Sequence, residues 1–433
     1  MDIRADALKR HTALLLTAGI AFAGVLVLVA TSAFPSRADD ISTTNMVEQF
    51  QSRLDAGTAK LEYANDGHGY LPAVLRAFRI PQDSQLLVFS GSSLQFDRIN
   101  QKTPRALYFQ NDMAVGSVQD GHLIEIITTD KDSGIAFYTL DVAKADKPKF
   151  VRRTSECIIC HGFAGRWSPG LMVANMDTGP NGQLLNLDPS HTFRLTDDRT
   201  PFDMRYGGWY VTGKTGAMQH RGNVTLSPGD PATLPPGGLD IPSLADRIEA
   251  NRYLEPGSDI VSLLTLEHQA GFVNLIGQIN AQYRGLDNTA IAPTLRATKK
   301  DVDSSIEELV RYMTFADEVP LPSPVTGSSD FTNTFSKAGP NDDQGRSLRD
   351  FDLKTRLFRY PLSYMVYSQA FDDLNPIAKD RLLRRLYAVL SGADHAPRSL
   401  HIDHAGGAAA IAIFAATKPN LPDYWKPVPE KRS

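Results

Sequence analysis

The feature that most constrains this chain is the five-residue run 157–161, Cys-Ile-Ile-Cys-His. Two thiols with two residues between them can add to the two vinyl groups of one haem, and the histidine that follows can bind its iron. Cys157 and Cys160 are the only cysteines in the 433 residues, so no second pair exists to complete a Cys₄ zinc site. The motif therefore predicts one covalent haem c, with His161 as the proximal iron ligand. A disulfide between the two cysteines is the weaker alternative.

The first 38 residues have the pattern of an export signal. Three basic residues precede an uncharged apolar run over about residues 12–34, and small residues at 36 and 38 suit a cleavage site. The run is long for a signal peptide and just long enough to cross a bilayer, so an uncleaved membrane anchor over 12–34 is the alternative. In both cases the rest of the chain lies outside the cytoplasm. We therefore expect a periplasmic or exported protein, which agrees with a haem that bacteria attach after export.

Composition narrows the possible partners. The formal net charge of -4 gives no signature of nucleic-acid binding and no polybasic membrane patch. The 42% of hydrophobic and 22% of charged residues are those of an ordinary folded protein. The chain is also several times longer than the roughly 100 residues of a small single domain, so it is expected to do more than hold a haem.

Residues 39–150 are predicted to form an α+β region. Helix-like apolar spacing follows residue 45, and a second short helix is expected over 71–78. Beyond residue 85 the pattern changes to short β-rich runs separated mostly by turn residues, which predicts an antiparallel meander. The four runs are 86–89, 106–109, 123–127 and 135–138.

The haem-binding region is predicted to cover residues 151–228. The segment that leads into it departs from the small helical cytochromes, in which an amphipathic helix with an aromatic residue precedes the motif. Here Arg153 takes the aromatic position, and Pro148 leaves little room for such a helix. The small all-helical cytochrome c fold is therefore not expected. The glycine-rich stretch 162–182 is either a loop around the haem edge or a plain surface loop.

A Pro- and Gly-rich linker over 227–238 separates this region from a mainly helical C-terminal region, 239–433. A long helix is expected to start at Ser258 as its N-cap and to run to about residue 284. Further helices are predicted over 300–316, 361–374, 376–390 and 406–417, with a polar linker or long loop over 320–343. The predicted fold class is α+β: an N-terminal β-meander, a haem segment and a mainly helical C-terminal half.

The ligand opposite His161 decides whether the iron is closed or open, because electron carriers usually fill this position and haem enzymes leave it free. His220 lies in an aromatic and glycine-rich stretch after the motif. His268 points toward the apolar side of its predicted helix, although a lone histidine there is more often a core residue. Met204 and Met218 are further candidates, and the absence of any protein ligand is the last alternative.

Three residues of the stretch 199–223 are candidates for haem contacts. Arg205 and Arg221 suit the two haem propionates, because arginine binds carboxylates through paired charge-assisted hydrogen bonds; surface salt bridges are the alternative. Trp209 can pack on the porphyrin or belong to an ordinary core.

With these stretches in hand, the chain resembles large, exported, single-haem bacterial proteins of the cytochrome c family. The resemblance rests on the order of several stretches and covers most of the mature chain. They are 105–109, 157–161, 207–213 with His220, 266–269, and 346–353 with 359–361. It implies haem and export, and it brings no assigned substrate.

Three functions follow from these expectations. The first is electron transfer in the periplasm with a redox partner protein. The alternative is a haem enzyme, a peroxidase or an oxygen-activating oxidase, in which His220 with Arg221 or Arg205 would assist O–O cleavage. A third is a redox or gas sensor, or a subunit of a respiratory complex. The single haem argues against the two-haem bacterial peroxidases, which need a second centre.

Overall fold

The computed structural model describes residues 45–162, 167–185, 193–227, 240–286, 296–394 and 402–425. The predicted signal or anchor over 12–34 and nearly all of the predicted linker, 228–238, lie outside these ranges. No helix within them is both long and apolar enough to cross a membrane. Residues 44–433 form one unit, and the protein has the predicted α+β class.

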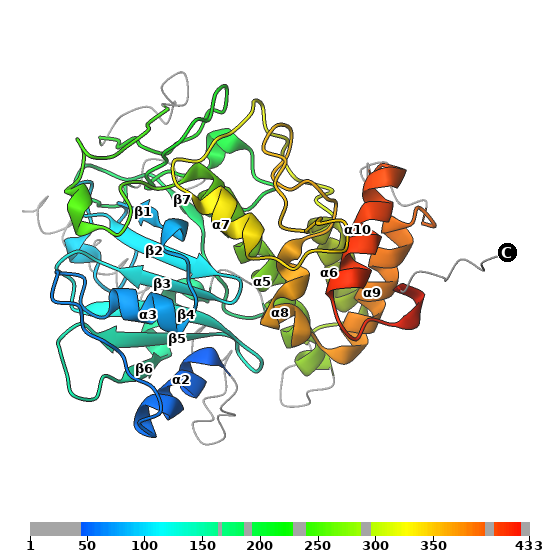
Figure 1. The fold of residues 1–433 in the computed structure, drawn as a ribbon, viewed down its shortest axis with the longest axis horizontal. Coiled ribbons are helices and arrows are strands. Elements are labelled where there is room, and N and C mark those ends of the chain that lie inside the picture. Colours follow the sequence, from blue (N-terminus) through cyan, green and yellow to red (C-terminus); the bar gives the residue numbers. More distant parts are fainter. Residues whose placement is uncertain are drawn as a thin grey trace, which may run out of the picture. The chain divides into compact units, whose positions relative to one another are not determined.

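A six-stranded antiparallel sheet in strict chain order fills the N-terminal half (Figure 1). Its strands are β1 (Leu86–Val88), β2 (Arg105–Gln110), β3 (Met113–Ser117), β4 (Leu123–Asp130), β5 (Gly134–Asp141) and β6 (Phe150–Arg153). The predicted meander is confirmed, but the sequence pattern does not reveal β3 and β6. Strand β3 contains a glycine and follows β2 after a two-residue turn, and β6 is a short strand ending in two arginines, so neither gives a strong apolar run.

Each face of the sheet packs against a different hydrophobic core, because successive side chains of a strand point to opposite sides. On one face, helices α2 (Met46–Asp55) and α3 (Leu71–Ala77) share a core with the strands. On the other, the strands share a core with the long helix α5 (Ile260–Leu286), and we call this side the α5 face. Its most buried strand residues are Leu86, Val88, Phe109, Ile135 and Phe137.

Helix α5 is buried along most of its length, as the predicted apolar stripe requires. The predicted N-cap is wrong by one residue. Asp259 caps the helix, because its Oδ1 accepts hydrogen bonds from the backbone N–H groups of Val261 (2.7 Å) and Ser262 (3.1 Å). Ser258 instead donates its hydroxyl to the carbonyl of Tyr210, which ties the start of α5 to the sheet region.

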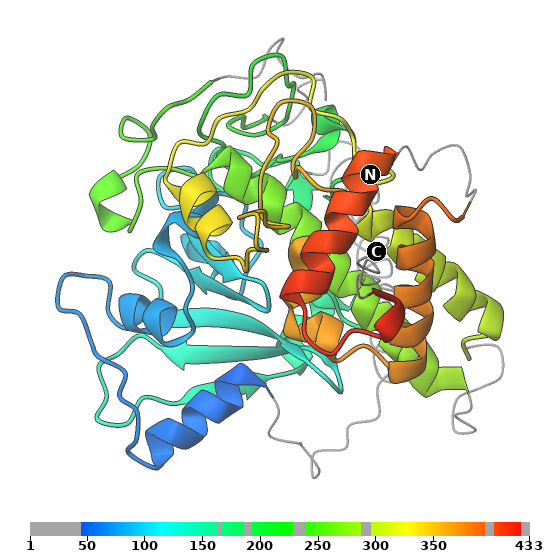
Figure 2. The same ribbon diagram turned by 45° about the vertical axis from the view of Figure 1, so that its right-hand side comes forward.

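The C-terminal half is mainly helical, and α6, α9 and α10 pack together there (Figure 2). Three of its predicted helices are confirmed: α6 (Lys299–Met313), α9 (Pro376–Leu390) and α10 (His404–Thr417). The predicted helix over 361–374 is wrong. Ser363 and Ser368 each cap a new start, so the segment divides into a 3₁₀ turn, Tyr364–Tyr367, and the four-residue α8, Gln369–Asp372. The predicted loop 320–343 contains α7 (Phe331–Lys337).

Candidate haem site

The C-x-x-C-H motif forms helix α4 (Ser155–His161), which begins two residues after the edge strand β6 ends at Arg153. A strand therefore precedes the motif, in agreement with the expectation that no helix fits there. Arg153 lies opposite Phe137 of β5, and its Nε donates a hydrogen bond to the hydroxyl of Thr139 (3.0 Å). These contacts hold α4 beside the α5 face of the sheet.

The ring of His161 is oriented by a backbone carbonyl from the following loop. Its Nδ1 lies 2.8 Å from the carbonyl oxygen of Gly170. A carbonyl oxygen can only accept, so Nδ1 carries the proton and the lone pair of Nε2 is left for a metal. The ring also packs on Phe137, with 4.8 Å between ring centroids. This orientation, with the second nitrogen hydrogen-bonded, is typical of histidines that bind metals.

The electrostatic environment keeps this imidazole neutral. Burial is the main cause that lowers the pKa of His161. The hydrogen bond to Gly170 opposes it, the positive charge of Arg105 lowers the pKa further, and Glu125 has the smallest effect, which raises it. A neutral ring at neutral pH is the form that binds a metal. Cys157 is half-buried and Cys160 is exposed, and both are free thiols. Burial raises the pKa of the Cys157 thiol to about 11, so it is protonated at neutral pH.

The loop after the motif is fastened to helix α5. The side-chain amide of Asn274 accepts a hydrogen bond from the N–H of Leu171 (2.7 Å) and donates one to its carbonyl (2.9 Å). The oxygen and the NH₂ group of one asparagine side chain thus both hold Leu171, which follows the Gly170 carbonyl that orients His161. The histidine is therefore positioned, by way of Gly170 and Leu171, by a helix that is itself buried.

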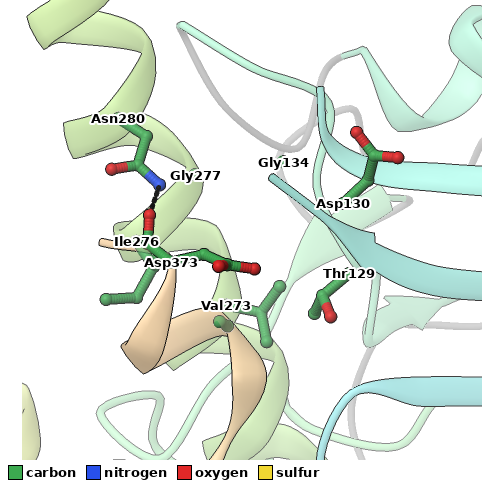
Figure 3. A pocket seen from close by; sticks show the side chains of 9 residues that line it. Thr129, Asp130, Gly134, Val273, Ile276, Gly277, Asn280 and Asp373 are labelled. Atoms are coloured by element: carbon green, nitrogen blue, oxygen red, sulfur yellow. Dashed lines mark hydrogen bonds between the residues drawn. The ribbon is translucent and has the colours of Figure 1, made fainter. Parts of the chain in front are cut away.

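A small cavity lies beside this attachment, between α5, α8 and the hairpin that joins β4 to β5 (Figure 3). Its lining includes Thr129, Asp130, Gly277 and Asp373, and Asn280 donates a hydrogen bond to the carbonyl of Asp373 (3.2 Å). The cavity has room for about one water molecule at most, so it is not a substrate pocket.

The α5 face next to the motif is partly open. A set of apolar side chains there is only partly buried although each packs on the α5-side core: Leu107, Ala114, Ile127, Cys157, Ile158 and Leu171. An ion pair crosses the same surface, with Arg105 Nη1 at 3.1 Å from Glu125 Oε2. Within the described residues, Arg105 Nε and Glu125 Oε1 are buried without a hydrogen-bond partner. Apolar surface, two free thiols, one neutral imidazole and unsatisfied polar atoms are together compatible with a covalently bound haem.

His268 is a fully buried residue of helix α5. Its Nδ1 lies 2.6 Å from Asp198 Oδ2 and its Nε2 lies 2.7 Å from the hydroxyl of Ser363, so both ring nitrogens are engaged. The ring is fully buried and stacks on Tyr312 at 5.0 Å. The loop after the C-x-x-C-H motif meets α5 at Asn274, six residues or about 9 Å further along the helix. The structure thus gives His268 the role of a hydrogen-bonded core residue.

His220 is also buried, with 5% of its surface exposed. Its Nδ1 accepts a hydrogen bond from the N–H of Gly222 (3.1 Å), so the proton of the neutral ring lies on Nε2. Among the described residues, this Nε2 has no hydrogen-bond partner. Burial lowers the pKa of His220 to about 4, so the ring stays neutral near pH 7. In this arrangement neither ring nitrogen offers a free lone pair to iron.

The two methionine candidates lie in unlike surroundings. Met218 is fully buried in the α5-side core. Met204 is half-buried, and its sulfur lies 3.4 Å from the guanidinium of Arg194. The structure thus places Met218 in the core and Met204 beside an arginine, and neither position identifies an iron ligand.

The three predicted haem contacts of the stretch 199–223 are engaged in buried structure. Arg205 pairs with Glu267 at 2.9 Å, and its other two guanidinium nitrogens donate to backbone carbonyls. All three nitrogens are therefore hydrogen-bonded. Arg221 pairs with Asp177 at 2.7 Å. Both pairs are at least nine-tenths buried, so the alternative of surface salt bridges is wrong for both arginines. Trp209 is 4% exposed in the core.

Sequence reasoning missed Arg105 and Glu125 as site residues. Their strand alternation places each on the α5 face, but the register that pairs them across β3 is not readable from the sequence.

No family model, curated protein or solved structure matches this chain. Within the described residues, no group of three or more His, Cys, Asp and Glu side chains is arranged to hold a metal ion directly.

Proposed function

We propose that this protein is an exported c-type cytochrome that carries one haem and transfers electrons with a periplasmic partner protein. Cys157 and Cys160 attach the haem, and His161 binds its iron. The observation that carries the proposal is the hydrogen bond from His161 Nδ1 to the Gly170 carbonyl, which leaves Nε2 free and directs it. When bound, the haem supplies the one-electron chemistry.

The surrounding residues adapt the site to electron transfer. The Gly170 carbonyl makes the imidazole a stronger donor to iron and fixes its orientation. The partly buried apolar side chains of the α5 face keep water away from one side of the site, which is one of the ways a protein sets a haem potential. Cys160 is exposed and Ile159 is 60% exposed, so the haem edge tethered at Cys160 lies near the surface. A partner protein can then approach that edge.

A second function, a haem enzyme with an open iron position, is favoured by a separate observation. His268 has both ring nitrogens in hydrogen bonds, and His220 has its Nδ1 lone pair engaged by Gly222. A haem on His161 then has one strong protein ligand, and its other side can take peroxide or oxygen.

The first test is expression in a bacterium that matures c-type cytochromes, followed by haem staining of a denaturing gel and a pyridine haemochrome spectrum. We expect one covalent haem per chain in the native protein and none in the double variant Cys157→Ser, Cys160→Ser. His404→Ala, at an exposed histidine of α10, serves as the control and is expected to keep the haem. A native protein that folds and matures without covalent haem would refute the proposal.

The second test separates the two functions. The visible spectrum is recorded for the ferric and ferrous protein, with and without carbon monoxide. A low-spin haem that does not bind carbon monoxide has both axial positions filled, which supports electron transfer and excludes the open-site enzyme. A high-spin haem that binds carbon monoxide supports the enzyme, and turnover of hydrogen peroxide would then be measured.

A further inference from the structure

An ion pair on the sheet lies beside the haem motif and is not explained by the fold. Arg105 of β2 and Glu125 of β4 are two strands apart, yet Nη1 of the arginine lies 3.1 Å from Oε2 of the glutamate. Both side chains are on the α5 face and are about 15% exposed. A paired charge on a sheet face that otherwise packs a core is unusual, because burying charges costs free energy that the pair only partly returns.

Gly116 of β3 makes this pair possible. The register sets Gly116 directly opposite Leu107 on one side and Glu125 on the other. A Cβ atom there would lie 3.3 Å from Leu107 Cδ2 and 3.6 Å from both Arg105 Cδ and Glu125 Oε2. The arginine side chain therefore crosses β3 above a residue without a side chain. A larger residue at 116 would occupy the path of the guanidinium.

Each residue of the pair also has one polar side-chain atom that makes no hydrogen bond within the described residues. Arg105 Nε and Glu125 Oε1 are buried and have no hydrogen-bond partner among the described residues. Buried polar groups without partners are rare in folded proteins, and a bound group is one explanation for them.

The register of the strands places this ion pair close to the motif. Thr139 of β5, which Arg153 holds at the entrance to α4, lies directly opposite Glu125 in the register. Adjacent strands are about 4.8 Å apart, so Glu125 is one strand from the residue that anchors the haem helix. The guanidinium that reaches Glu125 from β2 lies at the same place. Both charges of the pair are therefore within reach of a group bound at the motif.

We propose that Arg105 binds a haem propionate through its unpartnered Nε–H, and that Glu125 positions the guanidinium for this contact. The inference rests on the proposed function, since it needs a haem at the motif. Arginine suits the task because its fork of donors can serve Glu125 and a propionate together. Arg205 and Arg221, the two arginines that the sequence pattern favours, are instead held by Glu267 and Asp177.

The test measures the haem reduction potential by spectroelectrochemical titration of the whole protein. Removing the positive charge in Arg105→Gln should stabilise the ferric state and lower the potential. Removing the negative charge in Glu125→Gln should raise it. We expect each change to alter the reduction equilibrium at least threefold, where a tenfold change corresponds to 59 mV for one electron. The control is the exposed pair of Arg76 and Glu62, also 3.1 Å apart, whose Gln variants should leave the potential unchanged.

Two further variants separate a propionate contact from a purely structural role. Arg105→Lys keeps the charge but loses the fork, so it should shift the potential less than Arg105→Gln and remains measurable if the Gln variant does not fold. Gly116→Val blocks the crossing and should lower the potential like Arg105→Gln. A protein without covalent haem would defeat the proposed function. A protein with haem whose Arg105 and Glu125 variants shift the potential in the same direction, or no more than the controls, would overturn this inference alone.

Discussion

Substitution of His268 tests whether this residue is a hydrogen-bonded part of the core, as the structure indicates, and not an iron ligand. Its two ring nitrogens bind Asp198 and Ser363, and its ring stacks on Tyr312 with an interplanar angle of 2°. His268→Phe keeps the stacked ring and removes both hydrogen bonds. Each buried partner left unsatisfied costs about 1–3 kcal/mol, and a charged one costs more. We therefore expect the free energy of unfolding to fall by about 3–5 kcal/mol.

The loss is expected near the upper end because Asp198 has no second partner for its carboxylate. Among the described residues, its Oδ1 is buried without a hydrogen bond, so the variant would leave both carboxylate oxygens unsatisfied. His268→Ala also removes the ring, and the cavity should add a few kcal/mol, as for other large-to-small changes in cores. Stability is measured by urea unfolding at pH 7, with His404→Ala as the exposed control, which should change it by less than about 0.5 kcal/mol.

The same variants are examined by visible spectroscopy, because the spectrum separates a core residue from an iron ligand. A core residue should leave the haem spectrum and the response to carbon monoxide unchanged in the folded His268→Phe protein. A change from a low-spin to a high-spin spectrum, or new carbon monoxide binding, with little loss of stability would refute the reasoning and make His268 the distal ligand.

Three other outcomes follow from the structure. Burial holds the pKa of His220 near 4, so the unfolded chain, near 6.5, takes the proton first. The free energy of unfolding should then fall by roughly 2–3 kcal/mol between pH 6.5 and 4, and much less in His220→Gln, as urea titrations at both pH values would show. Burial raises the pKa of Glu318 to about 7, so stability is lost as pH rises from 4.5 to 7; Glu318→Gln should be about 1–3 kcal/mol more stable than the native protein at pH 8 and no more stable at pH 4. In Gly271→Ala the new Cβ would lie 2.2 Å from the hydroxyl of Tyr312, which should lower the thermal midpoint at a cost of about 1–3 kcal/mol, whereas Gly285→Ala, with space around it in the same helix, should not.

The fold could be predicted wherever the apolar pattern is strong. Four of the six strands, α5 and three C-terminal helices follow from alternation or helical spacing, since these patterns record which side of an element is buried. Where the predicted helix over 361–374 is wrong, side-chain hydrogen bonds to nearby backbone groups compete with the helix. Ser363 and Ser368 restart the chain inside an apolar stretch, because their hydroxyls cap new turns better than they continue a helix.

The site is less readable from the sequence, because its partners meet across long stretches of chain. The motif itself predicts the cysteines and His161, but the Gly170 carbonyl that orients the ring lies nine residues further along the chain, and no spacing rule predicts this contact. Helical spacing correctly places His268 on a buried side of its helix. Its partners Asp198 and Ser363 are 70 and 95 residues away, and no spacing rule connects them.

Helix α5 explains why so long a chain surrounds one motif. Three successive residues of this helix, Glu267, His268 and Gln269, are buried, and their side chains reach different segments of the molecule. Between them they bind Thr196, Asp198, Arg205, Tyr206, Ser363, Tyr364 and the carbonyl of Gln110.

These segments lie largely outside helices and long strands, so the polar side chains of the helix supply the order that regular structure does not. About two turns further on, Asn274 holds Leu171 and with it the carbonyl that orients His161. One buried helix thus holds both these irregular segments and the loop residue next to the carbonyl that orients His161. Under the proposed function, a ligand held this rigidly would change little between ferric and ferrous iron, as electron transfer requires.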